Sequence, residues 1–282
     1  MIRRPAARVL SSLFLAVIVV AGLTVPAEAQ YRPLPSSGYG TGGGPKGEPY
    51  HIEVAFNFWN PDPNIVIASE SLGIPGTDID VRADLNLQRK TTYEVRLVLR
   101  PAKKHKFRFN YIPLKYDSIT TLTGDIIFNG IRYPINTQVR SLLEWKTYRF
   151  GYEWDFISNS RGFFGVILEG KYTDVNVELE SAIGTEFARA KAPIPALGVT
   201  GRVYVTSYAS ITGEFTAFKL PDSIDENYSG HDYEWDFYGT FNFTKNVGVQ
   251  AGYRYHDLGY KVESDRGDVK LRGLYFGGVA RF

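Results

Sequence analysis

The sequence predicts an all-β fold, a closed antiparallel transmembrane β-barrel of about 10 strands (range about 8–12) with short periplasmic turns and long extracellular loops. Three observations carry this prediction: an apolar face on the last segment of the chain, a period-two alternation that recurs from Tyr93 onward, and short turns that alternate with long loops. Successive side chains of a strand point to opposite faces, so the alternation gives one face suited to lipid and one suited to a polar lumen.

The last segment, 268–282, has one wholly apolar face if it is a strand. That face contains Leu274, Phe276, Gly278, Ala280 and Phe282, while the other face contains Gly273, Tyr275, Gly277, Val279 and Arg281. About nine residues of tilted strand cross a bilayer, and 274–282 has that length. An aromatic residue at the end of a lipid-facing strand suits the membrane interface, so we expect this strand to close the barrel.

Earlier segments show the same alternation. In 50–60, Ile52, Val54, Phe56 and Phe58 share one face before Pro61 breaks the run. About nine crossings follow from Tyr93 onward, and the segment at Tyr50 raises the number to about ten. Residues 65–87 are weakly periodic, and the pattern leaves open whether they form two further crossings or one irregular insertion.

The connections between the expected strands alternate in length. Short turns are expected near 101, 159, 208 and 245, and longer loops near 128, 187, 225 and 262. Within the long loop at 117–138, Asn129-Gly130 lies between apolar flanks and predicts a hairpin. Such a loop suits either binding at the cell surface or capping of the barrel, and the sequence does not separate these roles. Near Thr173 the apolar side chains change faces, which indicates either a bulge or a strand that continues beyond the membrane.

Two sets of side chains form the candidate surfaces of the barrel. The aromatic set expected to face the membrane comprises Tyr148, Phe150, Tyr152, Trp154, Phe156, Tyr233, Trp235, Phe237, Phe276 and Phe282. The charged set expected to face the lumen comprises Glu94, Arg96, Arg108, Arg149, Glu153, Asp155, Glu169, Lys171, Arg202, Glu214, Glu234, Asp236 and Arg254. The charged set would form either a pore with charge selectivity or an ion-pair network that fills a narrow lumen. Barrels near eight strands are packed by their own side chains, whereas water-filled porins have about sixteen or more, so we favour the filled lumen.

The pentapeptide YEWDF occurs twice, at 152–156 and 233–237. It could mark a duplicated site. The alternation favours a simpler explanation, in which two strands each place aromatic residues toward the lipid interface and acidic residues toward the lumen.

The first 49 residues have the composition of a leader and a tail. Residues 1–29 are expected to be a cleaved signal peptide, because Arg3, Arg4 and Arg8 precede an apolar run and 27–29 (Ala-Glu-Ala) offers a cleavage site. A membrane anchor is the less favoured alternative. Removing three arginines and one glutamate with this leader would take the formal net charge from +2 to zero, so no nucleic-acid partner is expected. Residues 30–49 are rich in Pro and Gly and are expected to be a flexible tail, which leaves 50–282 for the barrel.

The leader, the alternating strands and the terminal segment GLYFGGVARF resemble the small outer-membrane β-barrels of Gram-negative bacteria, the OmpA-like and OmpW-like type. The resemblance covers 50–282 and is architectural. It implies location in the cell outer membrane, contact with outer-membrane lipid and lipopolysaccharide, and recognition by the barrel-assembly machinery through the strand ending at Phe282. No peptidoglycan-binding segment follows that strand in this sequence, so a wall-tethering role is not expected.

Chemistry-bearing motifs are sparse. The chain has no Cys and no GxSxG elbow, its histidines share no metal-ligand spacing, and no cofactor or metal is expected. His256, Asp257 and Ser264 form the one trio near a predicted rim that could serve a lipid-modifying hydrolase. We therefore expect a non-catalytic barrel that is structural or passes small solutes in a porin-like manner, with a lipid hydrolase or a surface-binding protein as the alternatives.

Overall fold

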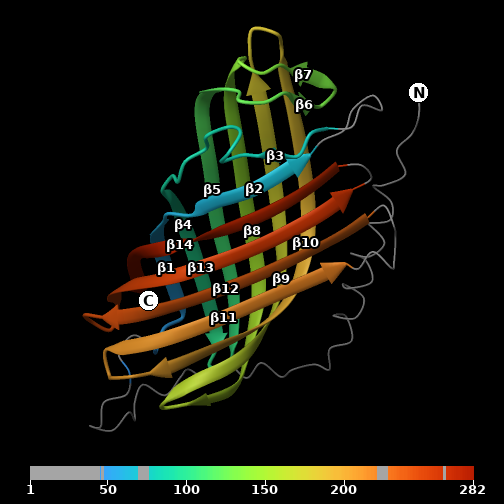
Figure 1. Cartoon of the computed structure of the whole chain (residues 1–282). Helices are drawn as coiled ribbons and strands as arrows, with labels where there is room; N and C mark the ends of the chain where they lie inside the picture. Colours follow the sequence, from blue (N-terminus) through green and yellow to red (C-terminus); the bar gives the residue numbers. More distant parts are fainter. Residues whose placement is uncertain (1–44, 46–47, 69–75, 221–227, 263–264) are drawn as a thin grey trace. The chain divides into compact units, whose positions relative to one another are not determined.

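Ten antiparallel strands close into a barrel when the first pairs with the last (Figure 1). The computed structural model describes residues 45, 48–68, 76–220, 228–262 and 265–282, so the expected leader and most of the expected tail lie outside the described residues. The barrel strands in order are β1 (Ile52–Trp59), β4 (Thr92–Ala102), β5 (His105–Thr121), β8 (Gln138–Asn159), β9 (Gly162–Glu180), β10 (Thr185–Tyr204), β11 (Ala209–Leu220), β12 (Tyr228–Asn242), β13 (Val247–Val262) and β14 (Asp265–Arg281). The predicted fold class and strand number are confirmed.

The pairing of β1 with β14 joins the two ends of the barrel sheet. Its register runs from Glu53 opposite Arg281 to Trp59 opposite Tyr275. The terminal residue adds further backbone bonds, because the Ile52 amide donates to the Phe282 carbonyl at 2.9 Å and the Phe282 amide donates to the Ile52 carbonyl at 2.8 Å. The closing role expected for the last strand is therefore confirmed.

Residues 65–87, whose course the sequence left open, do not make two further crossings. Strand β2 (Asp62–Ala68) pairs with the part of β14 that lies beyond β1, from Arg272 to Arg266, and the short β3 (Ile79–Asp80) pairs with β2. Pro61 separates β1 from β2, since proline cannot donate a ladder hydrogen bond. The segment therefore extends the barrel wall beside β14.

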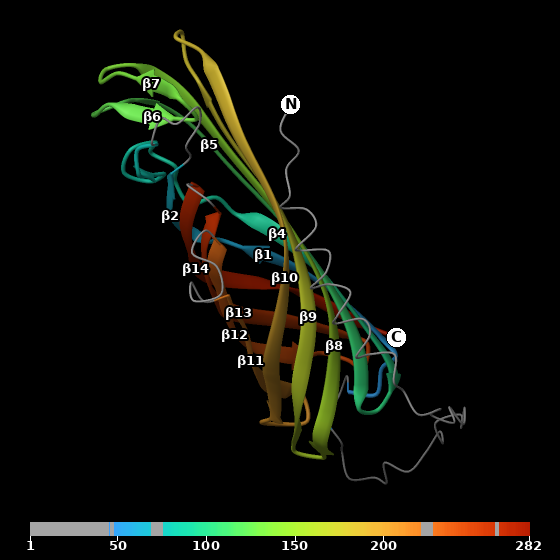
Figure 2. The same cartoon turned by 90° about the vertical axis from the view of Figure 1, so that its right-hand side faces the viewer.

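The long loop predicted at 117–138 is partly strand. β5 continues to Thr121 and β8 begins at Gln138, so the connection between them is shorter than expected. Within it, β6 (Ile126–Phe128) and β7 (Ile131–Tyr133) form the predicted hairpin. Asn129 has φ 49° and Gly130 has φ 86°, the positive values that a tight two-residue hairpin turn requires. Figure 2 shows this hairpin at the end of the barrel opposite the C-terminus, which we call the outer end.

The interior of the barrel changes character toward the outer end. Near the short turns the inward side chains are charged, whereas toward the outer end they are apolar and form a buried cluster. We call this cluster the outer core; it comprises Ile79, Val81, Leu85 and Leu87 of the segment after β2, Ile112, Leu114 and Tyr116 of β5, Ile126, Phe128 and Tyr133 of the hairpin, Val139, Leu143 and Trp145 of β8, Val177 and Leu179 of β9, and Val269 and Leu271 of β14.

The change of faces predicted near Thr173 reflects this change of interior and not a bulge. The pairing of β8 with β9 is continuous from Trp154 to Arg140, so β9 keeps its register through Thr173. Before that point Val166 and Leu168 are exposed on the outer face, and after it Val177 and Leu179 are buried in the outer core. The same strand thus has apolar side chains outside along one part and inside along the next.

Within the described ranges, the chain contains no helix with the length and apolarity of a membrane span.

We expect the outer core to hold the hairpin in place. Phe128 is almost fully buried in it, so Phe128→Ala should lower the free energy of unfolding by about 3–5 kcal/mol, the usual cost of removing a buried aromatic ring. Ile135 lies exposed in the same connection, and Ile135→Ala should change the value by less than about 0.5 kcal/mol. Urea unfolding of the purified barrel in detergent micelles measures both, and equal losses in the two variants would contradict this packing role.

Candidate functional site

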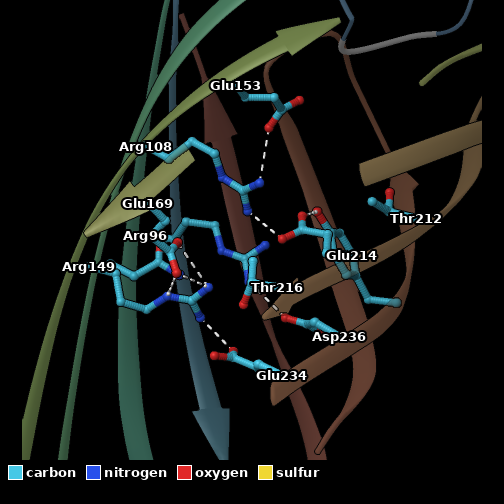
Figure 3. Close-up of polar contacts among 12 residues, drawn as sticks. Arg96, Arg108, Arg149, Glu153, Glu169, Thr212, Glu214, Thr216, Glu234 and Asp236 are labelled. Atoms are coloured by element: carbon cyan, nitrogen blue, oxygen red, sulfur yellow. Dashed lines mark hydrogen bonds and ion pairs between the residues drawn. The ribbon is translucent and has the colours of Figure 1, made fainter. Parts of the chain in front are cut away.

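The lumen of the barrel holds the densest group of charged side chains in the described structure. They come from alternate, inward-facing positions of β1, β4, β5, β8, β9 and β10 to β14, because a strand directs every second residue to the same face. Three arginines from one wall reach carboxylates on the opposite wall (Figure 3): Arg96 reaches Asp236, Arg108 reaches Glu214, and Arg149 reaches Glu234. These pairs cross the lumen and tie the two walls together.

Arg254 on β13 is at the centre of one group. Its guanidinium lies 3.0 Å from Glu94, 2.7 Å from Asp236 and 3.4 Å from Glu234, and the side chain is only 1% exposed. Arg96 joins the group through Asp236 at 3.1 Å. Further hydrogen bonds satisfy the carboxylates, including one from Asn57 to Glu94 at 2.9 Å and one from Tyr275 to Asp236 at 2.7 Å. A buried charge is tolerated when it is paired and hydrogen-bonded in this way.

A second group lies nearer the short turns. Lys106 contacts Glu153 at 2.6 Å and Asp155 at 2.8 Å, and Arg108 contacts Glu153 at 3.0 Å. The same arginine binds Glu214, which also accepts a hydrogen bond from Tyr238 at 3.0 Å. Each cation in this group therefore bridges two carboxylates.

A third group lies directly beneath the outer core. Lys171 contacts Asp232 at 2.5 Å and Glu234 at 3.1 Å, and Arg149 contacts Glu234 at 2.5 Å and Glu169 at 3.0 Å. His256 lies 3.0 Å from Asp232. The ring of His256 also packs edge-on against Trp145 of the outer core, so the charged and apolar parts of the interior are in direct contact.

Little space remains between these side chains. One cavity of about 20 Å³ lies within the second group, lined by Arg96, Arg108, Glu153, Phe163, Arg202 and Tyr238 among others. Another of about 20 Å³ lies where the third group meets the outer core, lined by Trp59, Trp145, Lys171, Glu234, Arg254 and His256 among others. A single water needs roughly 10–15 Å³ of such space, so each cavity has room for about one water.

The charged residues predicted to face the lumen all lie there. Glu94, Arg96, Arg108, Arg149, Glu153, Asp155, Glu169, Lys171, Arg202, Glu234, Asp236 and Arg254 are buried, and Glu214 is nearly so. Arg202 lies at the edge of the second group, beside Tyr238, and pairs with Glu48 at 2.9 Å. The charged groups therefore join strands from the start and the end of the barrel sheet, as in the pairing of Glu94 on β4 with Arg254 on β13.

The aromatic residues predicted to face the membrane lie on the outside of the barrel. Tyr148, Phe150, Trp154, Phe156, Trp235, Phe237, Phe276 and Phe282 are exposed, and Tyr152 and Tyr233 are half-buried. The two half-buried rings pack against neighbouring rings on the same surface, Tyr152 against His105 and Tyr233 against His231. In both copies of YEWDF the acidic residues are buried in the lumen, as in the simpler of the two explanations.

Several lumen residues were not in the predicted set. The predicted set omits Lys106, which follows the short turn expected near 101, and it omits Asp232, His256 and Arg281, which share parity with Glu234, Arg254 and Val279. Arg281 pairs with Glu53 at 2.6 Å next to the β1–β14 closure. Glu48 falls in the expected flexible tail, yet its carboxylate is largely buried against Arg202. The Pro- and Gly-rich composition around Glu48 contains no signal for this contact.

The trio considered for a hydrolase is not assembled by the described residues. His256 points inward to Asp232, whereas Asp257 points outward, where it accepts a hydrogen bond from Tyr255 at 2.9 Å and lies 3.3 Å from His231. Ser264 lies outside the described residues. Among the residues that the structure describes, no three His, Asp or Glu side chains are arranged to hold a metal ion.

The pairing in the lumen predicts that removing one central cation is costly. Arg254→Met leaves Glu94 and Asp236 buried without their closest cation, so we expect the free energy of unfolding to fall by about 3–5 kcal/mol. Arg189→Met is the matched control, because Arg189 pairs with Asp174 on the exposed surface and should matter little. Urea unfolding in micelles compares them, and an unchanged midpoint for Arg254→Met would contradict the interpretation.

No protein-family model matches the chain, and no curated protein sequence matches it. Among solved structures, the outer-membrane protease OmpT from Escherichia coli matches with a TM-score of 0.56 at 8% identity, over 82% of this chain and 96% of that one. Neisserial surface protein A matches at 0.37 and 16% identity over 82% and 97%, and OprG from Pseudomonas aeruginosa at 0.36 and 10% identity over 85% and 99%. The similarity to OmpT, together with the closed ten-stranded sheet, shows that the chain has the fold of the transmembrane β-barrels of Gram-negative outer membranes.

Proposed function

We propose that the protein is a non-catalytic, non-conducting barrel of the bacterial outer membrane, in which the wall has a structural role. This includes the part of the wall that surrounds the outer core, which we call the outer extension. The observation that carries this proposal is the filled interior. Cross-lumen ion pairs occupy the part near the short turns, the outer core occupies the other part, and the two cavities described above each have room for about one water. A barrel packed by its own side chains offers no aqueous path.

The outer surface supports the membrane location. Large apolar side chains are exposed on every strand of the barrel, for example Phe56 on β1, Phe109 on β5, Val199 on β10 and Phe276 on β14. A soluble protein rarely leaves so large a contiguous apolar area in water, whereas lipid covers it at no cost. A stacked pair of tyrosines, Tyr111 and Tyr148, with ring centroids 4.9 Å apart, lies where this apolar belt ends.

The proposed assembly route follows from the last strand. Phe282 is exposed at the end of β14, and its backbone is bound to β1 in the closed barrel. We propose that the assembly machinery recognises this strand before closure, while lipid and lipopolysaccharide surround the finished wall. Fractionation of bacterial envelopes tests the location, and recovery of the protein in the periplasmic fraction alone would contradict it.

A second candidate function is binding at the cell surface. The hairpin β6–β7 packs into the outer core, which favours capping over binding for that loop. The end of the β9–β10 hairpin differs, because Ile183 in the connection and Phe187 near the start of β10 are more than half exposed beyond the apolar belt. Cells displaying Phe187→Ser should lose adhesion to a protein-coated surface if these side chains bind a partner, and unchanged adhesion would remove this candidate.

The filled lumen predicts the electrical behaviour of the protein. Single-channel recordings in a planar bilayer should show little or no steady conductance, because charged and apolar side chains occupy the lumen along its length. Deleting 123–136, which removes the hairpin, should not create porin-sized steps, since the ion pairs beneath it remain. Large, steady openings of the unmodified protein would contradict the proposal.

A further inference from the structure

The outer surface carries a group of cations at the point where β14 passes from the apolar belt to the outer extension. The group comprises Arg82, Arg89 and Arg272 around the carboxylate of Asp62, with Lys270 two residues from Arg272 on the same face of β14, and we call it the arginine cluster. Three separate parts of the chain supply it: the start of β2, the segment between β3 and β4, and β14. Figure 1 shows β2 lying along β14, which brings these parts together.

The contacts within the arginine cluster converge on one carboxylate. Arg82 donates to one oxygen of Asp62 at 2.9 Å and Arg89 donates to the other oxygen at 2.9 Å. Arg272 is the direct cross-strand neighbour of Asp62 in the pairing of β14 with β2. The hydrogen bond from Arg89, together with the positive charges of Arg89, Arg82 and Arg272, holds the pKa of Asp62 below its ordinary value. Asp62 is therefore ionised at neutral pH and cancels only one of the surrounding charges.

Most of the donors of Arg82 and Arg89 have no protein partner among the residues that the structure describes. A guanidinium has five N–H groups in a planar fork, yet among the described residues Arg82 and Arg89 each donate one side-chain hydrogen bond, to Asp62, and their side chains are 54% and 59% exposed. Arg272 and Lys270 are exposed as well. Asp257 is the direct cross-strand neighbour of Lys270 and also interacts with Tyr255 and His231, so the cations in excess are the arginines. One arginine would satisfy Asp62, so the additional cations exceed what a structural ion pair needs.

The cluster lies at a defined level of the barrel wall. Leu274, the outward residue two positions after Arg272, is 71% exposed, and its neighbour across the strand pair, Tyr253, is 44% exposed. Leu271 and Val269, on the opposite face of the same strand, are already buried in the outer core. Arg272 is therefore the first outward residue of β14 beyond the apolar belt. At this level a barrel in a bilayer meets the lipid headgroups.

We propose that the arginine cluster binds the phosphate groups of a phosphorylated lipid headgroup in the outer leaflet of the membrane. Planar guanidinium forks bind phosphate oxygens in pairs, and charge-assisted hydrogen bonds of this kind are the strong ones. The acyl chains of the same lipid would lie against Leu274 and Tyr253. The inference rests on the proposed membrane location and is independent of whether the lumen conducts.

The test is a lipid titration of the full-length barrel in micelles of an uncharged detergent, followed by native mass spectrometry. The probes are diphosphorylated lipid A, the same lipid without its phosphates, and inorganic phosphate. The unmodified protein should retain the diphosphorylated lipid preferentially. The variant Arg82→Gln/Arg89→Gln/Arg272→Gln should bind it about 100-fold more weakly, since each cation near an anionic membrane surface contributes roughly a tenfold factor or less.

Two single variants keep the test independent of folding. Arg266→Gln is the matched control, because Arg266 is a similarly exposed arginine of β14, paired with Asp78, that lies about 20 Å farther out along the strand; it should bind the lipid normally. Asp62→Asn removes the negative charge and keeps every cation, so it should bind the lipid more tightly. Heat-dependent migration on gels shows which variants are folded.

Three results would overturn the inference. They are equal binding of the phosphorylated and dephosphorylated lipids, binding of inorganic phosphate as tight as that of the lipid, and an Asp62→Asn variant that binds no more tightly than the unmodified protein. Envelope fractionation of the same variants separates this failure from a failure of the proposed location. Variants that reach the outer membrane without phosphate-dependent binding would contradict the cluster assignment alone.

Discussion

One physical constraint organises the barrel: the surroundings of its wall change partway along continuous strands. The backbone pairing of β8 with β9 continues without interruption through the level at which the surroundings change. The apolar side chains, however, face outward on one side of this level and inward on the other. Where lipid covers the outside, apolar residues face outward and the lumen must take the polar ones. Where water covers the outside, apolar residues turn inward and pack as they do in a soluble protein. The charged groups, the outer core and the arginine cluster all occupy positions set by this level.

The constraint also explains why the lumen is so strongly paired. A narrow barrel in lipid cannot place its polar residues outside, and it lacks the diameter to leave them in bulk water. Buried ions are then stable only if each has opposite charges and hydrogen bonds within reach. Arg254 has three carboxylates within 3.4 Å, and Lys171 and Arg149 share Glu234. The network therefore fixes the distance between opposite walls as well as neutralising charge.

The sequence was sufficient for features that depend on strand parity. The closing role of β14, the number of crossings, the hairpin at Asn129-Gly130 and the inward charged set follow from period two and turn chemistry, which act locally. Features that depend on distant partners were not predictable. Glu48 is held by Arg202, far along the chain, and the course of 65–87 is set by pairing with the last strand. At Thr173 a bulge and a change of surroundings give the same pattern of residues, so only the continuous register distinguishes them.

The pairing of β1 with β14 has a consequence for the order of folding. The Glu53–Arg281 bond beside it joins residues 228 positions apart, whereas the other strand pairs join chain neighbours or near neighbours, apart from the pairing of β14 with β2 next to it. Loop-closure entropy therefore delays this seam until the remaining hairpins have formed. Until then the growing sheet has two open edges, each a template for pairing with another molecule. The contact that joins the most distant parts of the chain is thus also the one whose formation removes both exposed edges of the sheet.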